Sequence, residues 1–217
     1  MADGDRKTHD AAAGLLELAR QAQRLKQVAR QGWLDRGVPA ADVESVADHS
    51  FGVALLAWLA ALTAQSAGEA IDPTRVLQLA IIHDLPEAVI GDWTPYAGDA
   101  IPTGADAAAR AVFLDQRQTR SPERSAAKRA AEHAAIEALA DALPQAAASP
   151  LRDLWAELAA GTSQEARFLK QVDRLETYLQ SRAYLEQDAT LPMGSFAAEA
   201  AAEITHPLLA EIRDNAN

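Results

Sequence analysis

The stretch AIIHDLPEAVIGDWTP, residues 80–95, ends an apolar run in two polar residues and places two more just beyond it. His83 and Asp84 close the run, and Glu87 and Asp92 follow. A charge is costly to bury unless it is paired or binds a metal ion. The stretch therefore indicates a site where imidazole and carboxylate groups converge, with partners supplied by other parts of the chain.

Two of the five histidines, His49 and His83, lie in strongly apolar helical patterns near a helix end. Each by itself is more often a hydrogen-bonded core histidine than a ligand. Adjacent helical residues point about 100° apart, so His83 and Asp84 can share one ion only where a helix loosens. Pro86 favours such an end, because proline interrupts the helical hydrogen bonds.

A further carboxylate, Asp173, borders the apolar face of the segment ARFLKQVDRLETYLQ. Such a group needs a cation or hydrogen-bond donors. Its partner is either a nearby basic side chain, in an ordinary ion pair, or a metal ion shared with His49, His83 and Asp84. Two imidazoles and two carboxylates suit a divalent ion such as manganese, cobalt, iron or zinc.

The order His49, His83-Asp84, Asp173 resembles the H…HD…D signature of the HD-domain metal-dependent phosphohydrolases. The segments SVADHS, HDLPEAVIGDWTP and FLKQVDRLETYL, with ARQGWLDRGV upstream, are similar to the 5′-deoxynucleotidase branch of that superfamily. The resemblance implies an HD-type helical bundle, a homodimer, and hydrolysis of deoxynucleoside 5′-monophosphates to deoxynucleoside and phosphate. It also implies one divalent ion, Co²⁺ or Mn²⁺ first, with Mg²⁺, Fe²⁺, Ni²⁺ or Zn²⁺ as alternatives.

The same resemblance implies roles for individual residues. The metal ligands it implies are His49, His83, Asp84 and Asp173. Glu87 matches the acid that prepares the attacking water, and Asp92 matches a second catalytic acid. Arg30 matches a phosphate-binding arginine, and Trp33 matches a tryptophan linked to deoxyribose selection. Some members have these last two side by side, whereas two residues separate them here.

Three of these side chains also suit purely structural positions. Arg30 suits a solvated surface position, Trp33 suits a core anchor, and Asp92 suits a turn or cap. The signature also leaves two further functions open. One is an HD phosphohydrolase acting on another nucleotide phosphoester, such as a cyclic nucleotide, a triphosphate or an alarmone. The other is a non-catalytic helical interaction protein that retains the HD motif as a vestige.

Composition narrows the remaining classes. The formal net charge of −11 disfavours nucleic acids and anionic membranes as partners. The chain has no cysteine, which excludes disulfides, thiolate metal sites and cysteine nucleophiles. The N-terminus has no apolar signal core, and the apolar run FGVALLAWLAAL is short for a membrane span. We therefore expect a cytoplasmic protein.

The elements that must position these residues are helices. Hydrophobic residues make up 49% and aromatic residues only 5%, and β-branched runs are scarce. We expect an all-α, single-domain fold with a flexible tail at residues 1–10 and the HD domain at 11–217. The patterns predict helices at residues 11–29, 45–62, 72–85, 106–143 with a break at 121–122, 151–158, 163–186 and 196–212, and a loop at 30–39.

Overall fold

The computed structural model describes residues 2–102 and 107–216, and within these ranges it contains helices and no strand. The prediction of an all-α fold is thereby confirmed. The elements are α1 (Ala2–Arg24), η1 (Leu25–Gln27), α2 (Gln31–Arg36), α3 (Val46–Ser66), α4 (Pro73–Ile82), α5 (Glu87–Ile90), η2 (Gly98–Ala100), α6 (Ala107–Asp115), α7 (Pro122–Asp141), α8 (Gln145–Ala160), α9 (Gln164–Gln187), α10 (Gly194–Glu203) and α11 (Pro207–Asn215).

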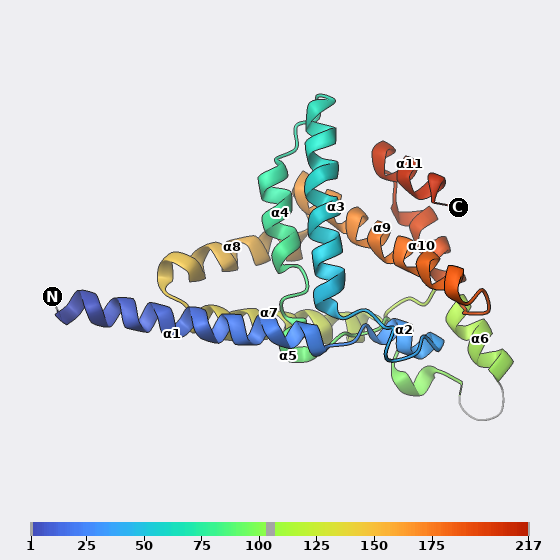
Figure 1. Cartoon of the computed structure of the whole chain (residues 1–217), viewed down its shortest axis with the longest axis horizontal. Helices are drawn as coiled ribbons and strands as arrows, with labels where there is room; N and C mark the ends of the chain where they lie inside the picture. Colours follow the sequence, from blue (N-terminus) through green and yellow to red (C-terminus); the bar gives the residue numbers. More distant parts are fainter. Residues whose placement is uncertain (1, 103–106, 217) are drawn as a thin grey trace.

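Helices α3, α4 and α9 pack against one another and form the centre of the molecule, with α10 and α11 covering α9 (Figure 1). Val53, Leu79 and Leu175 meet there with no exposed surface. Burying each such side chain contributes about 1.5–3 kcal/mol. This core fixes the relative positions of the three helices that bear the predicted metal ligands.

The starts of α3 and α4 follow from local capping signals. The Ser45 hydroxyl accepts the Asp48 N–H at 3.2 Å, and the Asp48 carboxylate accepts the Ser45 N–H at 2.9 Å. Asp72 caps α4 by accepting the Thr74 N–H at 2.9 Å, with Pro73 in the first turn. Caps of this kind stabilise a helix by about 1 kcal/mol. Both predicted helix starts are confirmed.

The regular helix is interrupted between α4 and α5. Helix α4 ends at Ile82, His83 is its C-terminal cap, and Pro86 precedes the first turn of α5. Gly91 ends α5 at a φ of 75°, a conformation that side chains disfavour. Because the helix stops at His83, the next residue is no longer held 100° away around the same axis.

Helices α7 and α8 form a second layer. They pack against each other, and α7 also contacts α5. Their core contains Leu85, Ile136, Leu139 and Trp155. Figure 1 shows α1 extending away from the rest of the molecule toward the N-terminus.

Several predicted boundaries are corrected by the structure. Residues 31–36 form α2 rather than a loop, because tertiary contacts hold this short turn. The Arg36 guanidinium there donates to the carbonyl oxygens of Gly32, Leu114 and Pro192. Helix α8 begins at 145 rather than 151, and the expected final helix at 196–212 is two helices separated before Pro207.

At the N-terminus, α1 runs through residue 11, where the sequence places the boundary between tail and domain. That division stays a prediction.

Helix α3 is also longer than the apolar run counted from the sequence. Its 21 residues are long and apolar enough to cross a membrane by length and composition alone, a criterion that core helices also meet. One face packs on α4 and α9. The opposite face carries an exposed row that we call the α3 stripe: Phe51, Leu55, Trp58, Leu59 and Leu62.

Candidate metal centre

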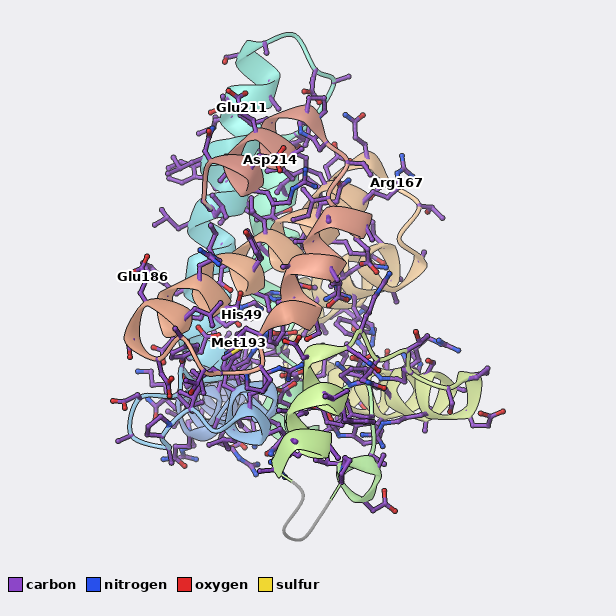
Figure 2. All side chains as sticks on the ribbon, turned by 90° about the vertical axis from the view of Figure 1, so that its right-hand side faces the viewer. His49, Arg167, Glu186, Met193, Glu211 and Asp214 are labelled. Atoms are coloured by element: carbon purple, nitrogen blue, oxygen red, sulfur yellow. The ribbon has the colours of Figure 1, made fainter. Side chains whose placement is uncertain are left out.

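Side chains from three segments converge at the inner end of α3. The His49 Nε2 lies 3.2 Å from the Asp173 Oδ1, 3.6 Å from the Asp84 Oδ2 and 3.5 Å from the His83 Nε2. The Asp84 Oδ2 is also 3.3 Å from the His83 Nε2. Figure 2 shows His49 in the interior of the bundle. The structure thus brings together all four side chains that the sequence groups as metal ligands.

Hydrogen bonds fix which ring nitrogens face this cluster. The His83 Nδ1–H donates to the Ala80 carbonyl oxygen at 2.7 Å, and the His49 Nδ1–H donates to the Glu176 Oε2 at 2.5 Å. Both partners accept, so each ring carries a proton on Nδ1. Each Nε2 therefore faces the cluster, where it can bind either a second proton or a metal ion, which is the orientation of metal-binding histidines.

The charges of the cluster are strongly coupled. Burial lowers the pKa of His49, but its hydrogen bonds to Asp173 and Glu176 prevail and raise that pKa to about 10. Burial alone would raise the pKa of Asp84, yet the His83 imidazole beside it holds that pKa far below its ordinary value. Burial likewise opposes ionisation of Asp173, and the hydrogen bond from His49 lowers the pKa of this carboxyl far below normal. The carboxylates are therefore ready anionic ligands, and a cation would compete with a proton for the histidines.

One buried carboxylate oxygen in this cluster has an unsatisfied hydrogen-bonding capacity. The Asp84 Oδ2 has no hydrogen-bond partner among the residues described, although it faces both histidines. A buried carboxylate oxygen left in this way costs free energy. A divalent ion would satisfy it, and imidazole nitrogens with carboxylate oxygens are suitable donors for first-row divalent metals. The residues present therefore fit a metal ion.

Glu87 lies beside the cluster at the start of α5 and is almost fully buried, with 3% of its surface exposed. Its Oε1 is 3.3 Å from the Lys128 Nζ on α7, and its Oε2 has no partner within the described part of the chain. Burial raises the pKa of Glu87 well above its ordinary value, and the nearby charges of Asp84 and Asp92 raise it further. Lys128, which no sequence pattern singled out, opposes this shift.

Arg30 precedes α2 and reaches the cluster from another side. Its guanidinium donates to the Thr177 hydroxyl at 3.2 Å and lies 3.6 Å from the Asp84 Oδ2. The Asp92 Oδ2 accepts the backbone N–H of Gln31 at 2.7 Å, which ties the loop after α5 to the residue next to Arg30. Arg30 is therefore held at the site by several groups and is not a solvated surface residue.

Trp33 is a core residue with one edge at the site. Only 1% of its surface is exposed, and its ring packs on Tyr184 and Phe196. Its Nε1–H donates to Glu44 at 2.8 Å. The structure thus favours the core-anchor interpretation of Trp33, and its part in sugar selection stays a prediction.

A cavity of about 410 Å³ opens beside the cluster. Asp84, Glu87 and Asp173 line it, and its wall includes Trp93. The basic side chains that line the same space are Arg30, Arg36, Arg117, Arg120, Lys128 and Arg174. An acidic protein therefore gathers basic side chains next to its candidate metal ligands.

Arg120 differs from Arg117 and Arg174, which line the same cavity. Arg117 pairs with Glu203, and Arg174 pairs with Glu199 and Glu203. Arg120 donates to the Trp93 carbonyl oxygen at 2.9 Å, but its Nε is buried without a partner. No carboxylate of the described residues forms an ion pair with it. This guanidinium has donors left for an anion.

Comparison with known proteins places this geometry in a family. The HD domain family model matches residues 22–209, so the chain belongs to the HD-domain family. It is 28% identical over 201 residues to the 5′-deoxynucleotidase HDDC2 of Mus musculus, covering 92% of this chain and 85% of that protein. The human 5′-deoxynucleotidase HDDC2 is 30% identical over 173 residues, covering 80% of this chain and 69% of the human one.

A solved structure shares the fold. A conserved hypothetical protein from Pyrococcus furiosus superposes with a TM-score of 0.63 at 26% identity, covering 93% of this chain and 98% of that one. The protein is thus an HD-domain phosphohydrolase homologous to 5′-deoxynucleotidases over nearly its full length.

Proposed function

We propose that the protein is a metal-dependent phosphomonoesterase that hydrolyses deoxynucleoside 5′-monophosphates to deoxynucleoside and phosphate. The observation that carries the proposal is that the two-histidine, two-carboxylate cluster adjoins a cavity also lined by basic side chains. The relatives named as 5′-deoxynucleotidases support the choice of substrate. His49, His83, Asp84 and Asp173 would hold the ion.

A divalent ion bound there supplies a Lewis acid that lowers the pKa of water and offsets charge on the phosphate. Glu87 accepts a proton from the attacking water, and burial, which raises the pKa of this carboxyl, makes its ionised form a stronger base. The water oxygen forms a bond to phosphorus as the bond to the sugar oxygen breaks, and the sugar oxygen leaves with the proton that Glu87 took from the water. Asp92, predicted as a second catalytic acid, positions Arg30 through the Gln31 N–H.

The phosphate oxygens would lie between two guanidinium groups. Arg30 is fixed on the cluster side by Thr177, and Arg120 faces the same cavity with its Nε unpartnered. Planar guanidinium groups match phosphate oxygens in geometry and charge. Trp93 on the cavity wall offers a ring on which a base can stack.

The test is a substrate panel. The purified chain is stripped of metal, Co²⁺ or Mn²⁺ is restored, and released phosphate is measured with deoxynucleoside and ribonucleoside 5′-monophosphates. The proposal expects metal-dependent release, faster from the deoxy series. Turnover only of cyclic nucleotides, triphosphates or alarmones would favour a phosphohydrolase of different substrate class, and no turnover with any metal would favour a non-catalytic interaction protein.

We also propose that a second copy of the chain covers the α3 stripe, which gives the expected homodimer. Phe51 is 72% exposed, and no charged residue lies between Ser50 and Ser66. Monomers rarely expose apolar patches of more than a few hundred Å². Stable interfaces bury about 800 Å² on each partner, and a row of five large apolar side chains can supply the centre of one. A cytoplasmic location stays a prediction.

A further inference from the structure

Glu176 stands behind His49, on the side away from the candidate metal ligands. It lies on α9, one helical turn after Asp173. Its Oε2 accepts the His49 Nδ1–H at 2.5 Å, while the other ring nitrogen, Nε2, faces Asp173 and Asp84. The His49 side chain has no exposed surface, and that of Glu176 is 14% exposed. Helix α9 thus holds both sides of one imidazole.

Gly52 explains how a carboxylate fits in this position. It lies on α3, one turn after His49, and a Cβ placed on it would be 2.6 Å from the Glu176 Oε1 and 3.3 Å from its Cδ. Glycine inside a helix costs about 0.5–1 kcal/mol relative to alanine. Its φ is not among the positive values, so backbone conformation does not require glycine here. Glycine is required instead because any side chain at this position would occupy the space of the Glu176 carboxylate.

A second ion in this place is the competing interpretation. Oxygen and nitrogen atoms of Glu44, His49 and Glu176 lie within 4.8 Å of one another, which resembles a metal site. However, the His49 Nδ1 already donates its proton to Glu176, so it has no lone pair for an ion. Glu44 is occupied by the Trp33 Nε1–H. The contacts therefore favour a carboxylate–histidine pair over a second metal.

We infer that Glu176 is a positioning residue: it orients the His49 ring and keeps its proton on Nδ1, and Gly52 provides the room it needs. The inference rests on the proposed metal centre, because it acts through His49 as a ligand. Carboxylates that hold the far nitrogen of a metal-binding histidine typically account for 10- to 100-fold in metal affinity.

The experiment measures Co²⁺ binding to the metal-free full-length chain by calorimetry, together with the visible absorption spectrum of the Co²⁺ complex. The variants are Glu176→Gln and Gly52→Ala, and the control is Glu186→Gln on the same helix, whose side chain lies at the outer surface (Figure 2). We expect both variants to bind Co²⁺ 10- to 100-fold more weakly with an altered spectrum. The control should match the wild type.

Wild-type affinity and spectrum in either folded variant would overturn the inference. Gly52→Ala keeps the inference testable if Glu176→Gln fails to fold, because alanine favours the helix and alters no polar group. Two Co²⁺ ions per wild-type chain, reduced to one in Glu176→Gln, would overturn it in favour of a second ion site. No nucleotide is used, so an inactive substrate panel would remove the proposed nucleotidase function and leave this result in force.

Discussion

The Nε2 atoms of His49 and His83 face each other across 3.5 Å, although 34 residues separate them in the chain. Both rings carry their proton on the opposite nitrogen, held by Glu176 and by the Ala80 carbonyl. Two imidazoles and two carboxylates thus converge through atoms that bind either protons or a cation. A divalent ion would bind all four groups at once.

Replacing Glu87 with Gln removes the proposed general base and keeps the shape of the side chain. We expect kcat to fall by about 10²- to 10⁴-fold, since that is the usual contribution of a positioned base. Co²⁺ affinity should stay near the wild-type value because Glu87 is not among the four ligands. Phosphate release and calorimetric Co²⁺ binding measure the two quantities. Turnover within a few-fold of wild type would remove Glu87 from the chemistry.

Metal binding should stabilise the fold, because the ligands come from separate helices. At a Co²⁺ concentration 100 times its Kd, the free energy of unfolding should increase by about 2.7 kcal/mol. Urea unfolding with and without Co²⁺ measures this. Asp173→Ala should abolish most of the gain, whereas Asp153→Ala, an exposed change on α8, should keep it. An equal gain in both variants would place the ion elsewhere.

Arg120→Gln should weaken binding of the phosphate group. Hydrogen bonds to charged partners are worth about 1.5–3 kcal/mol, which corresponds to roughly 10- to 100-fold. We expect KM for the nucleotide, and the inhibition constant for inorganic phosphate, to rise by such a factor while Co²⁺ affinity is unchanged. Arg129→Gln, an exposed neighbour on α7, is the matched control. Equal effects in both variants would argue against a specific anion contact.

Lys128→Gln should alter the pH dependence of turnover. Glu87 must be unprotonated to accept a proton, so activity is present above its pKa and is lost as pH falls through it. Lys128 lowers that pKa against the larger effect of burial. Removing the lysine should raise the pKa and move the acid limb of the kcat/KM profile to higher pH. An acid limb that stays in place, or moves to lower pH, would show that Lys128 does not lower the pKa of Glu87.

Phe51→Glu should disrupt the proposed dimer by placing a charge in the α3 stripe. Light scattering or sedimentation should report a dimer for the wild type and a monomer for this variant. Val112→Glu on α6 is the control, since Val112 is also exposed at 57% and lies outside the stripe. A monomeric wild type at micromolar concentration would refute the assembly.

The parts of the fold that depend on local signals were predictable. Ser45 with Asp48, and Asp72 with Pro73, fix two helix starts within one turn of sequence. Helix α2 was not predictable from its own residues. Gly32 lies in its first turn and Gly37 follows its last residue, and the helix is stabilised by contacts with distant parts of the chain. Arg36 finds its hydrogen-bond acceptors as far away as Leu114 and Pro192, and nothing in the residues around it indicates this.

The candidate site divides in the same way. The HD pattern grouped His49, His83, Asp84 and Asp173, and the structure brings these side chains together. The basic residues Arg120 and Lys128 were not predicted, because the segment around them has the composition of a solvated, alanine-rich helix. Glu176 follows Asp173 by one turn, a spacing that points to a shared helix face, but its bond to His49 depends on the packing of α3 against α9.

The side chains that line the cavity come from both layers of the molecule. The candidate ligands are carried by α3, α9 and the end of α4, whereas Lys128 is on α7, which packs against α8 and α5. A bound phosphate ester would therefore act as a tether between the layers. Amide hydrogen exchange in α7 should therefore slow when inorganic phosphate, alone or with the product nucleoside, fills the cavity. Occupancy of the site would then stabilise a helix that contributes no ligand to the ion.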